Sequence, residues 1–335
     1  MRINFREKNI EVFTISPRTL DHREYWQNIQ NVVSWSEKYT CTGVLIFTGN
    51  DTYVDPWLIA HSVLTQTRKL EPLIAVNPIY MHPFTAAKMI SSFAYLYKRK
   101  VWLNLVTGAA ITYLDAFYDN LSHDDRYERL LEYALIIDEL LAAKGLTYFE
   151  GRYYKISGLQ VIPKMPKELR PGYFLAGQSD AARRAASKLN ACNMQMLQPE
   201  FQHQLDGARG IHFGIVTRTT MDQAWEAARS WFPEDEEGSM LLELSMKNTD
   251  SVWKRRMKLL SEDDKLCDNG YWLDPFRNFK ADCPYLVGDY AKVADVIAQL
   301  ILQGVDTFIL DLPAKEEEFY HAQTAFRLAQ QKLIS

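Results

Sequence analysis

Cysteine is scarce in this sequence, with four among 335 residues. Cys41, Cys192, Cys267 and Cys283 lie far apart, form no Cys-x-x-Cys pair, and have no histidine beside them at metal-ligand spacing. This pattern excludes the usual zinc motifs and a disulfide framework. We therefore expect no metal site, and we expect Cys41 and Cys192, which lie in apolar runs, to be small buried side chains.

Long apolar runs and blocks of positive charge are missing as well. The first ten residues, MRINFREKNI, carry charges where a secretion signal has an apolar stretch, and no uninterrupted apolar run is long enough to span a bilayer. The formal net charge is -4, and Lys and Arg form no long block. Such a chain has no electrostatic footprint for nucleic acid or an anionic membrane. We expect a cytoplasmic protein that acts on small molecules, with neither nucleic acid nor membrane as a partner.

The common sequence signatures of phosphate and hydrolase sites do not occur. No Gly-x-Gly-x-x-Gly follows a strand, and there is no Gly-x-x-x-x-Gly-Lys, no Gly-x-Ser-x-Gly and no His-Glu-x-x-His. The dinucleotide-binding, P-loop, α/β-hydrolase and zinc-protease classes therefore have no support.

What the sequence does contain is a series of eight short β-rich runs with amphipathic helical patterns between them. Apolar strands that alternate with helices indicate a parallel sheet covered on its outer face, and eight of them favour closure into a (β/α)8 TIM barrel. We expect one domain over residues 1–335, with two domains as the alternative. The eight runs are Glu11–Ile15, Gly43–Phe47, Pro72–Val76, Val101–Val106, Gly172–Ala176, Ala191–Leu197, Ile211–Val216 and Asp306–Leu310.

Two insertions interrupt the alternation. LTYFEGRYYKISG, starting at Leu146, has the pattern of a β-hairpin with Glu150 and Gly151 at the turn. The longer insertion, at about residues 233–285 between the seventh and eighth strands, is polar with embedded aromatic residues. Such a segment is either a lid or disordered, and we favour a lid because loops after the strands form the active-site face of these barrels.

The stretch YFLAGQSDAARRAASKL, from Tyr173 to Leu189, places Gly177, Gln178, Ser179 and Asp180 between a strand and a helix. Free backbone N–H groups and the helix dipole favour an anion such as phosphate at this position. An ordinary turn with a Ser or Asp helix cap has the same local sequence, so both interpretations stay open.

Two further polar groups end or begin elements in the same way. NLVTG, which contains Asn104 and Thr107, ends the fourth strand, where a barrel opens to its ligand. HDDRY places His123 and Tyr127 at a helix start. A capped turn and a capping cluster are the alternative explanations.

Taken in order, several motifs resemble the bacterial-luciferase-like flavin monooxygenases, most closely the alkanesulfonate monooxygenases. The resemblance runs from about Thr42 to Leu310, and the ordered set is far more specific than any member. The motifs are TGVLIFTG (Thr42–Gly49), NLVTG (Asn104–Gly108), HDDRYERLLEY (His123–Tyr133), FLAGQSDAARRAA (Phe174–Ala186), NTDSV…RRM (Asn248–Met257) and LVGDYAKVADVI…GVDTFIL (Leu286–Leu310).

The resemblance implies a barrel that binds reduced FMN (FMNH2), supplied by a separate NAD(P)H:flavin reductase, and oxidises a substrate with O2. It also implies a homodimer or homotetramer, as in many members. Roles follow by position: a phosphate cradle with a nearby phenol, contacts to the flavin edge and ribityl chain, a wall beneath the ring, and a histidine that helps close the site. These residues are, respectively, Gln178, Ser179, Asp180 and Tyr127; Asn104 and Thr107; Ala75 and Val76; and His123.

The substrate half departs from the sulfonate enzymes. Their cysteine after the second strand falls near Tyr53, their Arg-x-His on the seventh strand aligns with His212-Phe213-Gly214, and their lid arginine aligns with Phe279, flanked by Arg277 and Lys280. Their Tyr-Pro-His becomes Pro313-Ala314-Lys315. Losing a fixed guanidinium removes bidentate recognition of a sulfonate, and a lysine does not replace it.

Candidates for the changed pocket are therefore Ser16, Arg18, Tyr53, His82, His212 and Arg277. His82 could transfer protons, or it could be a surface histidine before a helix.

We therefore expect a two-component monooxygenase that oxygenates a small organic metabolite by C-hydroxylation, N-oxidation or C–S cleavage. A simple alkanesulfonate is not the expected substrate; a biosynthetic oxygenase is favoured, and a substrate tethered to a carrier protein is one option within it. The alternatives are a non-catalytic flavin-binding protein and an oxidoreductase that uses coenzyme F420.

Overall fold

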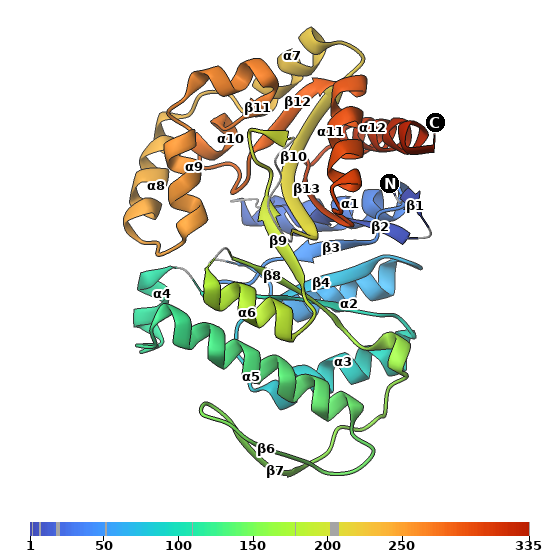
Figure 1. The fold of residues 1–335 in the computed structure, drawn as a ribbon, viewed down its shortest axis with the longest axis vertical. Helices are drawn as coiled ribbons and strands as arrows, with labels where there is room; N and C mark the ends of the chain where they lie inside the picture. Colours follow the sequence, from blue (N-terminus) through green and yellow to red (C-terminus); the bar gives the residue numbers. More distant parts are fainter. Residues whose placement is uncertain are drawn as a thin grey trace. The chain divides into compact units, whose positions relative to one another are not determined.

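Eight parallel strands close on themselves in the computed structural model, which describes residues 1, 3–6, 8–17, 21–50, 52–108, 110–177, 179–201 and 208–334 (Figure 1). The strands are β2 (Lys8–Ile15), β3 (Gly43–Ile46), β4 (Glu71–Val76), β5 (Trp102–Leu105), β8 (Gly172–Ala176), β9 (Cys192–Met196), β10 (Gly210–Arg218) and β13 (Thr307–Asp311). They pair in this order, and β13 pairs with β2 again. The predicted (β/α)8 barrel is confirmed, and all eight predicted strands are present.

The chain separates into two compact units, Leu45–Asn193 and a second unit formed by Met1–Val44 with Met194–Ser335. We describe each unit by itself. The expectation of one domain over the whole chain stays a prediction.

The unit Leu45–Asn193 alternates buried strands with helices. Its helices are α2 (Pro56–Gln66), α3 (Pro83–Tyr97), α4 (Ile111–Ala116), α5 (His123–Ala142), α6 (Asp180–Lys188) and the short 3₁₀ turn η1 (Lys167–Leu169). α2 and α3 begin with proline, whose fixed φ and missing N–H suit the first helical position. Ser122 caps the start of α5 by accepting from the Asp125 N–H, and the helix ends at Ala142 because Ala143 already has an extended backbone.

The predicted hairpin is present as β6 (Thr147–Glu150) and β7 (Lys155–Leu159). Its turn lies one step later than predicted, since Glu150 is still in the strand and the Gly151 N–H donates to the Tyr154 carbonyl at 2.9 Å. The Glu132 carboxylate on α5 holds this turn by accepting from the N–H groups of Arg152 and Tyr153 at 2.8 and 2.9 Å.

The second unit adds strands that the sequence did not predict. β1 (Ile3–Phe5) pairs antiparallel with β2. β12 (Tyr285–Asp289) pairs parallel with the C-terminal half of β10, and β11 (Tyr271–Trp272) pairs antiparallel with β12. The helices of this unit are α1 (His22–Lys38), α7 (Met221–Trp231), α8 (Glu236–Lys247), α9 (Val252–Leu260), η3 (Asp264–Asn269), α10 (Asp274–Arg277), α11 (Tyr290–Leu302) and α12 (Glu316–Ile334).

The predicted lid segment, residues 233–285, is occupied by α8, α9, η3, β11 and α10. A buried cluster that includes Trp272, Cys283 and Tyr285 packs the end of this segment against α7 and β12. The segment is therefore largely helical, and its role as a lid stays a prediction.

Candidate functional site

The turn between β8 and α6 is built around Gly177. Its φ is +145°, and a Cβ added there would lie 2.6 Å from the Tyr127 hydroxyl oxygen and 2.7 Å from the Ala182 Cβ. Both the backbone conformation and the space therefore require glycine. Gly177 therefore brings its backbone close to the start of α6 without a side chain of its own.

Hydroxyl groups stand on either side of this turn. Ser179 is the N-cap of α6, and its Oγ accepts from the Ala182 N–H at 3.2 Å. The buried Tyr127 donates its hydroxyl to the Ala176 carbonyl at 3.2 Å. The start of the nine-residue helix α6 leaves backbone N–H groups that its own hydrogen bonds do not use, and its dipole places partial positive charge there. The arrangement can hold an anion such as phosphate.

The acid in this first turn is turned toward a cation. Asp180 has a side chain that is 79% exposed and pairs with Arg183 on the next turn of α6. Its charge is thereby partly compensated and screened by water. Gln178, the remaining residue of the predicted cradle, lies outside the described residues.

His123 is brought next to Tyr127, as the shared motif predicted. The two rings lie 5.1 Å apart on the first turns of α5, and the His123 Nδ1 is 2.9 Å from the Asp124 carboxylate. His123 is half-buried, so its ring stays partly open to solvent.

The strand register decides which of the predicted flavin contacts share a face. Ala75 on β4, Asn104 on β5 and Phe174 on β8 lie in one row across the sheet. Val76 lies in the next row with Leu105, and because side chains alternate along a strand, it points to the opposite face. The structure brings together Ala75 and Asn104, and it does not bring Val76 to them.

Thr107 follows β5 and is half-buried beside Gly108, whose φ is +79°. A Cβ on Gly108 would lie 3.3 Å from the amide nitrogen of Asn77, a buried residue directly after β4. The sequence reasoning missed Asn77, although it carries the same signal as Asn104, a polar side chain at the end of an apolar strand.

Two substrate candidates lie in the same unit. Tyr53 is 52% exposed and lies just before α2. His82 is the N-cap of α3, where its Nδ1 accepts from the Phe84 N–H at 3.2 Å, and its ring meets the edge of Tyr154 at 5.9 Å. Burial raises the pKa of Tyr154 to about 12, so this phenol stays neutral. His82 thus has a capping role in the structure, and its proton-transfer role stays a prediction.

The other substrate candidates belong to the second unit. His212 lies on β10 in a row with Met196 of β9 and Ile309 of β13, and it is half-buried. Arg277 ends α10 and pairs with Asp274 at 3.0 Å. Ser16 is buried after β2, and Arg18 lies outside the described residues.

The surroundings of Phe279, where the sulfonate enzymes carry an arginine, contain cations that are already paired. Besides Arg277, Lys280 pairs with Asp235 at 2.6 Å, and Lys254 lies 3.8 Å from Asp282 while its ammonium stacks over the Phe279 ring. A sulfonate would have to displace these carboxylates to gain a cation.

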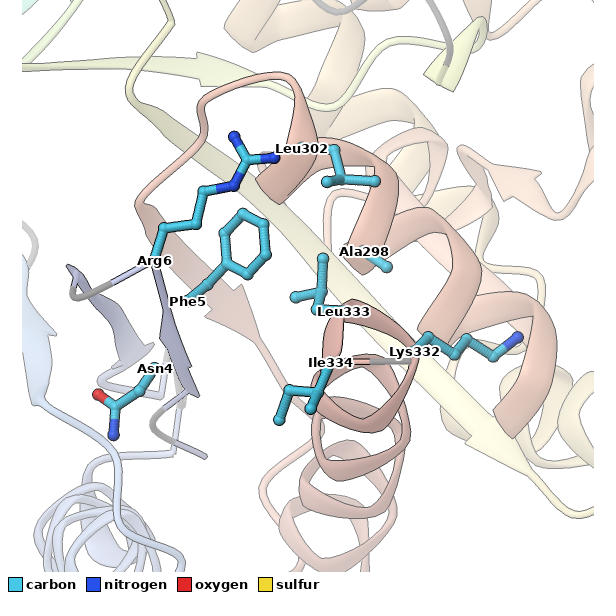
Figure 2. Close-up of a pocket in the computed structure, with 8 residues that line it drawn as sticks. All are labelled: Asn4, Phe5, Arg6, Ala298, Leu302, Lys332, Leu333 and Ile334. Atoms are coloured by element: carbon cyan, nitrogen blue, oxygen red, sulfur yellow. The ribbon is translucent and has the colours of Figure 1, made fainter.

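The described residues show neither a metal site nor a membrane-spanning helix, and no predicted site residue lines their described cavity. Within the described ranges, no three or more His, Cys, Asp or Glu side chains come together in a way that could hold a metal ion. No helix in the described part of the chain is long and apolar enough to cross a membrane. Figure 2 shows a cavity of about 450 Å³ lined by Asn4, Phe5, Arg6, Ala298, Leu302, Lys332, Leu333 and Ile334, none of which is a predicted site residue.

The sequence matches the family model described as luciferase-like monooxygenase over residues 12–205. The chain belongs to the luciferase-like monooxygenase family. It is 30% identical over 311 residues to 4-(gamma-L-glutamylamino)butanoyl-[BtrI acyl-carrier protein] monooxygenase BtrO of Niallia circulans, an alignment that covers 89% of this chain and 90% of the relative.

Solved structures show the same fold at low sequence identity. Riboflavin lyase RcaE, crystallised with modified FMN and riboflavin, has a TM-score of 0.77 at 16% identity, covering 96% of this chain and 92% of its own. Long-chain alkane monooxygenase LadA has a TM-score of 0.73 at 16% identity, covering 97% and 91%. This luciferase-like monooxygenase therefore shares its barrel with enzymes of diverse substrates.

Proposed function

We propose that this luciferase-like monooxygenase binds reduced FMN, receives it from a separate NAD(P)H:flavin reductase, and uses O2 to oxygenate an acyl group held on a carrier protein. The observation that carries the cofactor assignment is the turn at Gly177, a residue without a Cβ that lies near the Ser179 and Tyr127 hydroxyls at the start of α6. The expected homodimer or homotetramer stays a prediction.

The residues present fit FMN. The missing Cβ at Gly177 lets the turn pass close to the Tyr127 hydroxyl, and the backbone N–H groups at the start of α6 supply donors for a dianion. Ala75 and Asn104, on one face of β4 and β5, would offer a small apolar contact and an amide to the ring. Activation of O2 is the chemistry that reduced FMN supplies when bound, while the protein holds, orients and shields it.

The substrate class rests on two observations. The relative BtrO, at 30% identity over nearly the whole chain, is named for an acyl-carrier-protein substrate. Phe279 stands where the sulfonate enzymes have an arginine, and the nearby Arg277, Lys280 and Lys254 pair with Asp274, Asp235 and Asp282, which argues against a guanidinium held for a sulfonate. The chain therefore keeps the cofactor half of the alkanesulfonate subgroup and differs from it in the substrate half.

The first experiment tests the cofactor with Ser179→Asp. Aspartate caps a helix as well as serine does, so α6 should remain, but the new carboxylate would face the phosphate. We expect anaerobic titration with reduced FMN to show binding weakened by about 1–3 kcal/mol. Ser187→Asp adds the same charge at an exposed position near the other end of α6 and should leave the affinity unchanged.

Three results would contradict this proposal. Unchanged affinity in Ser179→Asp would argue against the cradle. Tight binding of oxidised FMN without any reaction with O2 would favour a non-catalytic flavin-binding protein. Preference for F420 over FMN would favour an F420-dependent oxidoreductase.

The substrate class can be tested separately by mass spectrometry. We would supply 4-(γ-L-glutamylamino)butanoyl loaded on the BtrI carrier protein, with reduced FMN and O2, and compare it with the free acid. The proposal expects one oxygen atom to be added to the carrier-bound acyl group. Equal or faster conversion of the free acid would contradict the requirement for a carrier.

A further inference from the structure

One face of β10 and β13 carries two polar side chains: His212 is the third residue of β10, and Asp311 is the last residue of β13. The Phe308 ring meets Phe326 of α12 at 5.5 Å, so Phe308 and Leu310 face the outer helices. Ile309 and Asp311 therefore point to the opposite, interior face of the barrel.

The register places His212 on this same interior face. His212 pairs with Ile309, and Gly214 pairs with Asp311, the last residue of β13. His212 and Asp311 are thus diagonal neighbours, with Cα atoms about 8 Å apart from strand spacing and rise. Both side chains are half-buried. Residues at the carboxyl end of a barrel strand are where catalytic groups of this fold are found.

The Asp311 carboxylate is held in place by two side chains at and just before the start of β12. The Cys283 thiol lies 3.7 Å from its Oδ2, and the Tyr285 phenol also hydrogen-bonds to it. Burial raises the pKa of Tyr285 well above its ordinary value, so the phenol stays neutral and acts as a donor. The Tyr285 ring can lie there because Gly214 has no side chain, since a Cβ would be 2.3 Å from the ring.

Two other ionisable groups near this carboxylate, Tyr271 and Glu318, have hydrogen-bond or ion-pair partners elsewhere. Tyr271 on β11 donates its hydroxyl to the Leu197 carbonyl at 3.1 Å, and burial also raises its pKa. Glu318 on α12 pairs with Arg218 and accepts from the Trp231 indole at 2.8 Å.

We propose that Asp311 is the positioning residue of His212, and that the two form the proton-handling pair of the oxygenation reaction. The assignment of a reaction rests on the proposed function, but the pairing does not. In the step we envisage, neutral His212 takes one proton from the substrate on a ring nitrogen and becomes an imidazolium. The Asp311 carboxylate stays ionised and stabilises that charge, and the proton later passes to product or solvent.

The pairing can be measured without flavin or substrate. In protein labelled with ¹³C at the histidine Cε1, His212 is assigned by the loss of its signal in His212→Asn and is then titrated. A nearby carboxylate favours the charged imidazole, so Asp311→Asn should lower the measured pKa of His212 by about 0.5–1 pH unit. Tyr285→Phe, which removes a donor to Asp311, should move the titration of the carboxylate, seen in the His212 shift, to higher pH.

Asp306→Asn is the matched control. Asp306 precedes the opposite end of the same strand and pairs with Arg209 at 3.1 Å, so its replacement should leave the His212 titration unchanged. Far-UV circular dichroism would confirm that each variant is folded. Identical His212 titrations in the wild type and Asp311→Asn would overturn the pairing, whatever the cofactor experiments show.

Discussion

Gly177 shows how much a single residue decides in this site. The residue has no Cβ and a φ of +145°, and these two properties together let the Tyr127 hydroxyl approach the start of α6. A side chain here would strain the backbone and push against the Tyr127 hydroxyl and Ala182, and so would displace the start of α6, where we propose that the anion is held. Stability and cofactor affinity are therefore coupled at this position.

Gly177→Ala should accordingly lower the free energy of unfolding by about 1–3 kcal/mol and weaken reduced-FMN binding at least as much as Ser179→Asp does. Urea unfolding and anaerobic fluorescence titration measure the two effects. Gly145→Ala is the control, because no atom lies within 4 Å of an added Cβ there and the variant should be nearly neutral. Normal affinity in Gly177→Ala would mean that the turn does not hold the cofactor.

Among elements, the contact between α11 and α12 depends on the charge of one histidine. The Tyr290 hydroxyl, at the start of α11, lies 2.6 Å from Nδ1 of His321 on α12. Burial, and next the Arg218 guanidinium, lower the pKa of His321 below its ordinary value. The folded state therefore prefers the neutral imidazole, which can accept the hydrogen bond.

The sign of the pH effect follows from this shift. The unfolded chain binds the proton near pH 6.5 and the folded chain only at lower pH, so stability is fully present above about pH 6.5 and is lost as the pH falls below it. We expect His321→Gln to lose less free energy of unfolding between pH 7 and pH 5 than the wild type. His22→Gln, at a side chain that is 74% exposed, should behave like the wild type.

At the same scale, the elements that sequence could predict are those with a local signal. Apolar runs separated by polar caps predicted the eight barrel strands. Pro83 and Ser122 are local signals of the same kind, because they stand at the starts of α3 and α5. β12 was not predicted, because Tyr285–Asp289 is a short apolar run directly before a helix and its strand state depends on pairing with β10. The hairpin turn was misplaced by one residue because Glu132, which holds it, is distant in sequence.

For the whole molecule, the described site residues are shared between the two units, with the substrate candidates Tyr53 and His82 in the same unit as the cofactor candidates. All described candidates for cofactor binding lie in Leu45–Asn193, whereas His212, Asp311 and Arg277 lie in the other unit. The sequence could point to candidate cofactor residues such as Asn104 and Ser179 because they stand at a strand end and at a helix cap, whereas Ala75 and Val76 came only from the family resemblance. It could not identify Asp311 or the different orientation of Val76, because both follow from strand register, which is non-local.

This division predicts that the two functions can be altered separately. Arg277→Ala breaks a partly exposed pair with Asp274, which should cost at most about 1 kcal/mol of stability. We expect reduced-FMN affinity to stay within about twofold, while turnover of the carrier-bound substrate changes. Calorimetric titration and a turnover assay test the two parts, and a tenfold loss of flavin affinity would contradict the division.

The aromatic ring that lies against Gly214 has a consequence for comparing members of this family. Because the two groups occupy the same volume, a sequence with any side chain at the position of Gly214, such as the histidine of the sulfonate enzymes, cannot also keep a tyrosine in this place at the position of Tyr285. The two positions are mutually exclusive and should change together during divergence. Relatives that have glycine and tyrosine at the positions of Gly214 and Tyr285 are therefore the ones in which we expect the proposed pair of His212 and Asp311, in place of the Arg-x-His of the sulfonate enzymes.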